Sequence, residues 1–86
     1  MAKQFRLQVF TQEKKVVDEL ITSLQAPGVD GYFGVLADHA PLISALGKGD
    51  LTIVSSEGTR VIDLTGGFLE VVNNTATILA DSISEA

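Results

Sequence analysis

Hydrophobic and polar side chains alternate in several short segments of the chain. Near the N-terminus, Phe5, Leu7 and Val9 are separated by polar residues, which is the period of a strand that buries one face. Two further pairs of segments rich in aliphatic residues surround turn residues: 51–54 with 60–64, and 68–72 with 76–80. Gly58 in the first pair and Asn73-Asn74 in the second suit the left-handed backbone of a tight turn. The pattern predicts an N-terminal strand and two β-hairpins.

The segment of residues 16–26 has a different period. Its apolar residues recur at the i, i+3, i+4 spacing of an amphipathic helix: Val16, Val17, Leu20, Ile21 and Leu24. The β-branched residues among them weakly favour a strand instead. The residues alone leave both interpretations open.

Turn-forming residues occur at short intervals between these segments: Pro27-Gly28, Asp30-Gly31, Gly47-Lys48-Gly49-Asp50 and Gly66-Gly67. They leave room only for short elements, and short strands at such spacing are typical of a sandwich or a barrel. The chain has 86 residues without a linker-like stretch or an internal repeat. We therefore expect one undivided domain with one modest core.

Composition narrows the range of partners. The formal net charge is −5, hydrophobic residues make up 45% of the chain and charged residues only 20%. A negative chain is repelled by phosphate backbones, so we expect no nucleic-acid partner. Charges recur throughout, and no stretch approaches the roughly 18 apolar residues that a membrane-spanning helix needs. The first ten residues lack the apolar core of a secretory signal, so we expect no leader.

The chain offers few groups for catalysis. Asp38 and His39 are adjacent, and Ser44, Ser55 or Ser56 could complete a Ser/His/Asp set, but no Gly-x-Ser-x-Gly turn is present. A single histidine and the lack of cysteine leave too few ligands for a zinc site. We predict neither an enzyme active site nor a bound metal.

Glycine-rich stretches give no phosphate site. A P-loop needs a glycine five residues before its Gly-Lys, and Leu42 stands at that position relative to Gly47-Lys48. Gly66-Gly67 is better explained by a backbone that turns sharply or approaches another strand closely. Asn73-Asn74-Thr75 fits a glycosylation sequon, but the asparagines are better explained as hairpin residues. We predict no cofactor and no glycan.

The run Gly31-Tyr-Phe-Gly-Val-Leu-Ala-Asp-His-Ala-Pro-Leu42 resembles the hallmark of the epsilon subunits of F-type ATP synthases. In that family the motif reads Gly-x-Phe/Leu-Gly-hydrophobic-x-x-x-His-Ala-Pro-hydrophobic. Other matching blocks occur in the family's order and spacing: Ala45-Leu46, Lys48-Gly49-Asp50-Leu51, Gly66-Gly67-Phe68-Leu69-Glu70-Val71 and Thr77-Ile78-Leu79-Ala80-Asp81. The resemblance covers essentially the whole chain from Phe5 to Asp81.

The resemblance implies an all-β fold, a flattened β-sandwich of about ten short strands that forms a single domain over residues 1–86. Residues 16–26 would then be a strand. The family usually continues after the block that ends in Asp81 with a two-helix C-terminal domain, which can inhibit ATP hydrolysis. This chain stops at Ala86, so we expect that helical domain and its regulation to be absent.

By the same resemblance, the chain is a non-catalytic rotor subunit in the central stalk of a proton-translocating F-type ATP synthase. It would bind the gamma subunit and the c-ring, couple proton flow to ATP synthesis, and lie peripherally on the inner face of an energy-transducing membrane. The resemblance places one gamma contact at Thr11 and the c-ring contact at the following residues: Asp30, Gly31, Tyr32, His39, Ala40, Pro41 and Leu42.

Two of these residues have a second interpretation. Tyr32 could face the core, or it could be an interface anchor beside the Asp30-Gly31 turn. His39 could serve mainly to hold its own turn by hydrogen bonds, with Pro41 fixing the backbone.

An alternative from another class is a lipoyl- or biotinyl-type carrier domain modified at Lys48, which would also be all-β and of similar length. Such domains set the lysine between Met residues or after Asp, whereas here it stands in Gly47-Lys48-Gly49-Asp50. The intact mass of the protein would distinguish the two classes, because attachment adds mass at Lys48.

Overall fold

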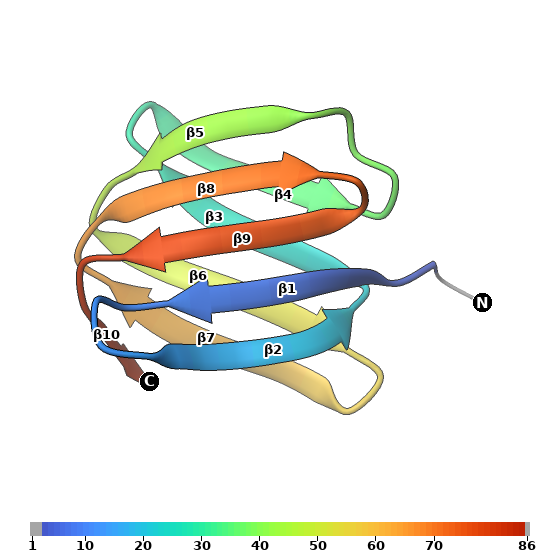
Figure 1. Cartoon of the computed structure of the whole chain (residues 1–86), viewed down its shortest axis with the longest axis horizontal. Coiled ribbons are helices and arrows are strands. Elements are labelled where there is room, and N and C mark those ends of the chain that lie inside the picture. Colours follow the sequence, from blue (N-terminus) through green and yellow to red (C-terminus); the bar gives the residue numbers. More distant parts are fainter. Residues whose placement is uncertain (1–2, 86) are drawn as a thin grey trace.

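A computed structural model describes residues 3–85, and within that range every regular element is a β-strand (Figure 1). The strands are β1 (Phe5–Phe10), β2 (Lys15–Ile21), β3 (Ser23–Gly28), β4 (Gly31–Leu36), β5 (Leu42–Leu46), β6 (Gly49–Ser55), β7 (Gly58–Leu64), β8 (Gly67–Val72), β9 (Thr75–Ala80) and β10 (Ile83–Glu85). The predicted all-β fold, the N-terminal strand and both hairpins are confirmed. The described residues include no helix that is long and apolar enough to cross a membrane.

The strands form a curled sheet with two layers. The front layer in Figure 1 holds β5, β8, β9, β1 and β2 in that order, and the back layer holds β4, β3, β6, β7 and β10. β3 joins the layers, because it pairs with β4 along its whole length, with β6 over Ser23–Gln25 and with β5 at Gly28. All pairs are antiparallel except β1 with β9, which run parallel.

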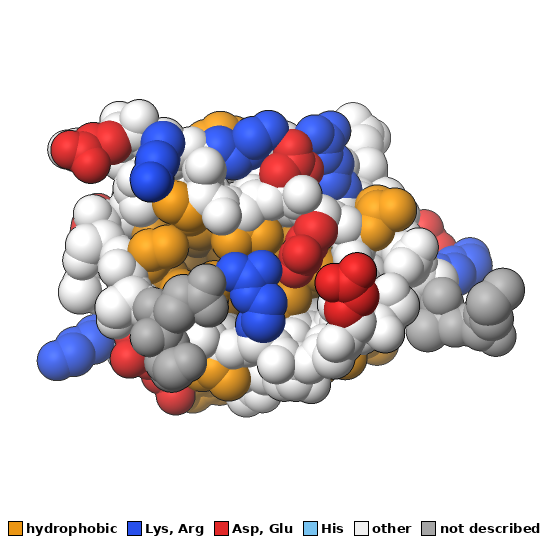
Figure 2. Space-filling view, turned by 90° about the horizontal axis from the view of Figure 1, so that it is seen from below, with side chains coloured by type: hydrophobic (Ala, Val, Ile, Leu, Met, Phe, Trp, Pro, Cys, Tyr) orange, Lys and Arg blue, Asp and Glu red, His pale blue; other side chains and the backbone are white. Residues whose placement is uncertain are grey.

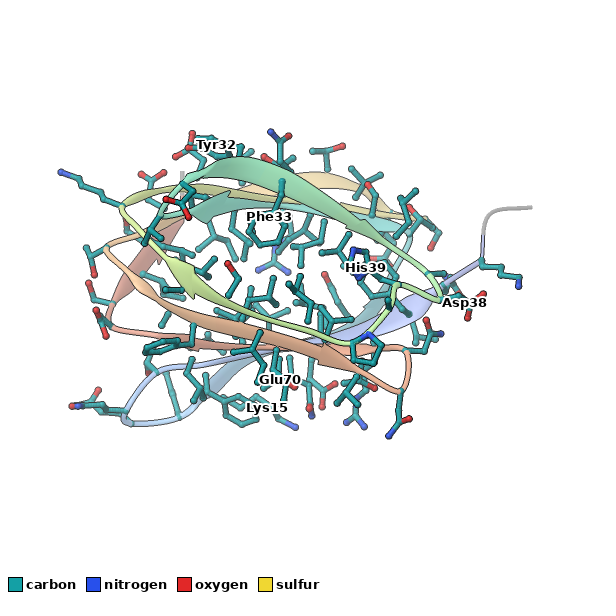
Figure 3. The ribbon with its side chains drawn as sticks, turned by 90° about the horizontal axis from the view of Figure 1, so that it is seen from above. Lys15, Tyr32, Phe33, Asp38, His39 and Glu70 are labelled. Atoms are coloured by element: carbon teal, nitrogen blue, oxygen red, sulfur yellow. The ribbon has the colours of Figure 1, made fainter. Side chains whose placement is uncertain are left out.

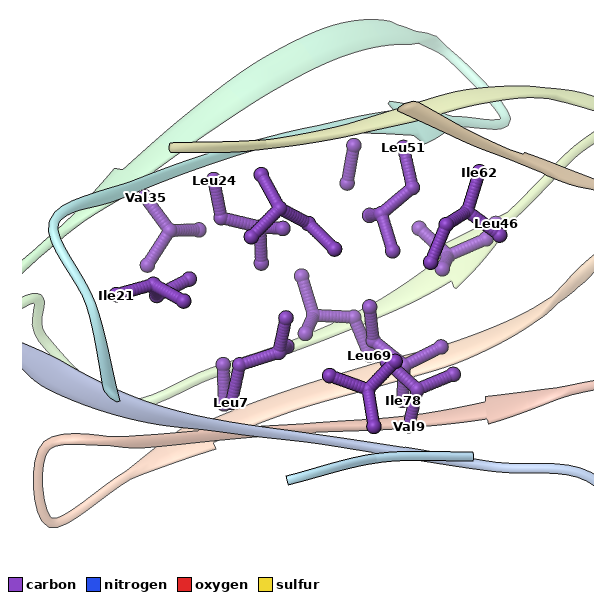
Figure 4. Packing of buried hydrophobic residues seen from close by; sticks show 14 of the residues in the cluster. Leu7, Val9, Ile21, Leu24, Val35, Leu46, Leu51, Ile62, Leu69 and Ile78 are labelled. Carbon is purple, nitrogen blue, oxygen red and sulfur yellow. The ribbon is translucent and has the colours of Figure 1, made fainter. Parts of the chain in front are cut away.

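The core lies between the two layers, where alternate side chains of each strand point inward (Figure 4). The predicted inward set of β1 is confirmed, because Phe5, Leu7 and Val9 are all buried. Within residues 3–85, no buried residue has a polar or charged side chain. Burial of one large aliphatic side chain contributes about 1.5–3 kcal/mol, so this apolar core is the main source of stability.

The segment with the helical period forms β2 and β3, which meet at a corner. Thr22 makes the corner, since its N–H and its hydroxyl both donate to the carbonyl oxygen of Val54, at 2.7 and 3.0 Å. Before the corner Val17 and Ile21 are buried, and after it Leu24 is buried. The corner changes the inward positions from odd to even, so the buried residues Val17, Ile21 and Leu24 recur at helical intervals, whereas Leu20 is exposed. The expected strand is confirmed, with a break at Thr22.

The turns have the backbone that the sequence predicted. Gly58 has a φ of 125°, and Asn73 and Asn74 have φ values of 52° and 57°. The predicted crowding at Gly66-Gly67 is confirmed, because a Cβ on Gly67 would lie 2.1 Å from the carbonyl oxygen of Leu79. Asp38 also has a left-handed φ of 64°, which the pattern did not predict.

One edge of the sandwich stays open. At the bottom of Figure 1, β2 and β7 lie side by side without pairing within residues 3–85, and Figure 2 shows hydrophobic side chains in the seam between them. Val16 and Ile83 pack there against the core. The Arg60 guanidinium reaches across to Glu19 at 3.5 Å. Because exposed ion pairs contribute at most about 1 kcal/mol, apolar packing closes this seam more than charge does.

Candidate functional site

The outer surface of the front layer carries a cluster of exposed hydrophobic side chains. Ile43, Phe68 and Leu79 are 74%, 58% and 57% exposed. Phe68 is the cross-strand partner of both Ala45 and Leu79, and partners in neighbouring strands point to the same side of a sheet. We call this surface the β5–β8–β9 face, made by Ile43, Ala45, Phe68, Val72 and Leu79.

Charge is nearly absent from the β5–β8–β9 face. Its one acidic residue is Glu70, which points outward from the middle of β8 (Figure 3). Glu70 lies opposite Ile43 and between Phe68 and Val72, and the exposed residues around it are apolar. An exposed apolar surface is typical of a docking site.

The adjoining strands β1 and β2 are charged instead. Asp18 accepts hydrogen bonds from Arg6 at 2.8 and 2.9 Å and from Lys15 at 2.6 Å. The Arg6 bonds, with that of Lys15, hold the pKa of the Asp18 carboxyl well below its usual range. This charged network ends the apolar surface on its β1–β2 side.

Thr11, the predicted gamma contact, lies at the end of β1 on the border of the β5–β8–β9 face. Its N–H donates to the carbonyl oxygen of Lys14 at 2.9 Å, which fixes the backbone in the β1–β2 turn. A shallow hollow connects Thr11 with Phe10, Phe68 and Leu79. Sequence reasoning did not single out the last three residues.

Asp30 lies in the β3–β4 turn, and Gly31 and Tyr32 begin β4. The Tyr32 ring lies on the outer side of the back layer and is 54% exposed (Figure 3). Its hydroxyl accepts a hydrogen bond from the N–H of Asp50 at 3.0 Å. Tyr32 is therefore not a core residue, and it ties β4 to β6 across β3.

His39, Ala40 and Pro41 are exposed in the loop between β4 and β5, and Leu42 begins β5. The His39 Nδ1 atom lies 2.7 Å from the carbonyl oxygen of Ala40. This contact is local, so it fits the interpretation that His39 holds its own turn.

The structure divides the predicted c-ring residues into two groups. Residues 30–32 lie at one end of the sandwich and residues 39–42 at the other, because β4 runs between them (Figure 3). The longest dimension of the molecule is 33 Å. A flat partner against one end cannot contact both groups. The β1–β2 turn, which begins with Thr11, lies at the same end as the β3–β4 turn, which includes Asp30 (Figure 1).

Ser44 and Ser55, two of the serines considered for a Ser/His/Asp set, have hydrogen-bond partners in the backbone. The Ser44 hydroxyl donates to the carbonyl oxygen of Ala45 at 3.2 Å, and Ser55 Oγ accepts from the N–H of Glu57 at 3.2 Å. Neither hydroxyl is hydrogen-bonded to His39. Within the described range, no three histidine, aspartate or glutamate side chains are close enough together to hold a metal ion.

The sequence profile described as the beta-sandwich domain of the ATP synthase Delta/Epsilon chain matches residues 4–86. The chain belongs to this family. The ATP synthase epsilon chain of Maridesulfovibrio salexigens is 41% identical over 86 residues, which are 100% of this chain and 61% of that protein. The epsilon chain of Protochlamydia amoebophila is 45% identical over 80 residues, which are 92% of this chain and 54% of that protein. The chain therefore spans little more than half the length of these relatives.

Two solved structures share the fold. A chain of the Euglena gracilis mitochondrial ATP synthase, in a structure of OSCP, F1 and c-ring, superposes with a TM-score of 0.89 at 22% identity, over 95% of this chain and 53% of that one. A chain from the central stalk and c-ring of the Tetrahymena thermophila mitochondrial ATP synthase gives a TM-score of 0.82 at 16% identity, over 96% of this chain and 67% of that one. The family match accounts for the whole chain, which the carrier alternative at Lys48 does not.

Proposed function

We propose that this chain is the β-sandwich part of a non-catalytic rotor subunit of an F-type ATP synthase, and that it links the gamma subunit to the c-ring. The named relatives are ATP synthase epsilon chains, which supports a role in the same complex. The chain would then lie on the inner face of an energy-transducing membrane and take part in coupling proton flow to ATP synthesis, with no active site of its own.

The β5–β8–β9 face is the observation that carries this proposal. A part of a rotor has to be stiff, and it has to hold its partner through non-covalent contacts alone. Paired strands that bury one face resist slippage, because a one-residue slip would turn core side chains outward. The cores of protein interfaces are depleted in charge, as this face is. We assign the β5–β8–β9 face to gamma, with Thr11 on its border.

We assign the turn at residues 30–32 to the c-ring. This turn lies at the same end of the sandwich as the β1–β2 turn that holds Thr11 (Figure 1), so a partner on the face and a partner on that end would lie next to each other. Residues 39–42 lie at the far end, where β5 begins, and they border the β5–β8–β9 face. We therefore assign His39, Ala40, Pro41 and Leu42 to gamma rather than to the ring.

Calorimetric titration of the chain into the gamma subunit of the same organism tests the proposal. We expect one-to-one binding by the unchanged chain. Leu79→Glu places a carboxylate within the apolar face, and burying that charge against gamma should raise the Kd at least about tenfold, or 1.4 kcal/mol.

Leu20→Glu is the matched control. Leu20 and Leu79 are both 57% exposed on the front layer, but Leu20 lies on β2, outside the β5–β8–β9 face. We expect the Kd of Leu20→Glu for gamma to stay within about twofold of the Kd of the unchanged chain, which is a change in binding free energy well under 1 kcal/mol. Equal losses in both variants would reject a specific role for the face. Failure of the folded, unchanged chain to bind gamma would overturn the assignment.

A further inference from the structure

The loop of residues 37–41 has an unusual backbone for its sequence. It contains no glycine, yet Asp38 has a left-handed φ of 64°. Aspartate adopts this conformation more readily than most residues but less readily than glycine. The contact between His39 and Ala40 lies within the loop and cannot fix it relative to the sandwich. Contacts from elsewhere in the chain have to do so.

Asn74, in the β8–β9 turn, supplies those contacts. Its Oδ1 accepts a hydrogen bond from the N–H of Asp38 at 2.7 Å, and its Nδ2 donates to the carbonyl oxygen of Gln4 at 3.0 Å. Its own carbonyl oxygen accepts from the N–H of Arg6 at 3.1 Å. One residue thus joins the β4–β5 loop, the segment before β1, and the β8–β9 turn.

The turn itself does not require these side-chain bonds. Asn73 and Asn74 both have left-handed φ values, as a two-residue hairpin turn needs, and glycine would satisfy both positions. Within residues 3–85 the Asn73 side chain has no hydrogen-bond partner, whereas the Asn74 amide uses both its oxygen and its nitrogen. The Asn74 side chain therefore serves the loop rather than the turn.

An ion pair determines which groups of the loop are left for a partner to contact. Lys3 Nζ lies 2.8 Å from Asp38 Oδ2, so the one acidic group of the loop is paired with a cation. The exposed remainder is the imidazole of His39, the methyl group of Ala40 and the ring of Pro41. This surface continues the low charge of the β5–β8–β9 face, which starts at Ile43 on the next strand.

We propose that Asn74 is a positioning residue that holds the loop of residues 37–41 ready as a rim of the gamma-binding surface. The proposal rests on the assignment of the β5–β8–β9 face to gamma. A loop that is already ordered does not lose backbone entropy on binding, whereas a loop that has to be ordered by the partner loses some for each residue. Gamma would recognise the rim as an apolar, uncharged edge with one hydrogen-bonding ring.

Asn74→Gly tests this with Asn73→Gly as its matched control. Both changes keep a residue that tolerates positive φ, but only the first removes the bond to the Asp38 N–H. In Asn74→Gly we expect faster exchange of the Asp38 amide by NMR and a Kd for gamma that rises at least about fivefold. In Asn73→Gly both quantities should stay within about twofold of the unchanged chain.

A third variant tests positioning directly. Asn74→Asp keeps an oxygen that can accept from the Asp38 N–H, but it replaces the donor to Gln4 with a second carboxylate oxygen and adds a negative charge near Asp38. We expect Asn74→Asp to show slower exchange of the Asp38 amide than Asn74→Gly, because the acceptor for that N–H is kept. Thermal unfolding of all three variants shows whether the turn is equally stable in each.

Several outcomes would overturn the proposal. An unchanged Kd in Asn74→Gly, with faster exchange at Asp38, would show that the loop need not be held for binding. Equal loss of affinity in both glycine variants would reduce Asn74 to a turn residue. If the unchanged chain did not bind gamma, the proposed function would be wrong, and so would the role of the loop as a rim of the gamma-binding surface. Unaltered Asp38 exchange in Asn74→Gly would overturn the positioning role whether or not gamma binds.

Discussion

At the scale of single residues, Gly67 is the position least able to accept a side chain. It has a φ of 149°, and an added Cβ would lie 2.1 Å from the Leu79 carbonyl oxygen and 3.0 Å from Ala80 Cα. Both contacts are with backbone, which cannot move aside without breaking the β8–β9 pairing. We expect Gly67→Ala to lower the free energy of unfolding by more than about 3 kcal/mol, measured by urea denaturation.

Gly58→Ala separates crowding from backbone conformation. Gly58 has a φ of 125°, but a Cβ there would meet no atom within 4 Å. Its substitution should lower the free energy of unfolding only by the conformational cost, about 1–2 kcal/mol. Similar losses at the two positions would show that crowding at Gly67 contributes nothing beyond its φ.

Asp50 and Asp63 are cross-strand partners on β6 and β7, and both side chains are exposed. A hydrogen bond with Asp63, and then its charge, raises the pKa of Asp50 above the usual 3.8. A carboxyl that binds its proton more tightly when folded stabilises the fold at low pH, and this contribution is lost as the pH rises past about 4. Asp50→Asn should therefore raise the Tm at pH 7.

The gain from Asp50→Asn should shrink as the pH falls toward 3, where the carboxyl pair of the unchanged chain holds a proton. Circular dichroism melts between pH 3 and pH 8 would measure it. Asp63→Asn should give a similar profile, because it removes the other half of the pair. A gain that stayed constant over this range would contradict the pairing.

At the scale of elements, Tyr32 connects strands that are not neighbours, since its hydroxyl on β4 accepts from the Asp50 N–H on β6. Tyr32→Phe removes this bond and leaves the ring in place. We expect the free energy of unfolding to fall by about 0.5–1.5 kcal/mol, toward the lower end because the ring is half exposed.

Urea denaturation would measure the decrease in the free energy of unfolding of Tyr32→Phe. Hydrogen exchange of the Asp50 amide would show where in the structure the change occurs. Faster exchange confined to Asp50 and its neighbours on β6 would support the cross-strand tie. An unchanged unfolding midpoint would mean that water replaces the hydroxyl at no cost.

Alternation predicted β1, and aliphatic segments around turn residues predicted the β6–β7 and β8–β9 hairpins, because each of these strands buries alternate side chains over part or all of its length. It failed over residues 16–26, since Thr22 turns the chain and changes which positions face inward. β5 and β10 are only five and three residues long, too short for a period to be read. For these parts the resemblance to a known family was needed.

The candidate site was predictable only in part. Alternation shows which residues of a strand point the same way, but it does not show whether the outward set is covered. In β8 both sets are largely apolar, with Leu69 and Val71 inward and Phe68 and Val72 outward. That double apolar pattern in a two-layer domain was the available indication of a docking face. Asn74 gave no such indication, because its role depends on a loop that is distant in sequence.

At the scale of the whole molecule, the two ends of the sandwich should differ in function. Asp30→Arg reverses an exposed charge at the end assigned to the c-ring, and Glu57→Arg makes the same change in the β6–β7 turn at the other end. We expect only Asp30→Arg to weaken assembly on a reconstituted gamma and c-ring complex, by about tenfold or more. Cosedimentation with the complex would measure it, and equal effects at both ends would reject the assignment.

The parallel pair of β1 with β9 also bears on how the protein is made. β1 leaves the ribosome before the other strands of the sandwich. One of its edges pairs with β2, but the other stays unpaired until residues 75–79 of β9 have been synthesised. Domains fold as units during synthesis at about 5–20 residues per second, so this sandwich can close only when nearly its whole chain has emerged. A chain that stopped short of Thr75 would keep an open strand edge, which is a template for aggregation with other nascent chains.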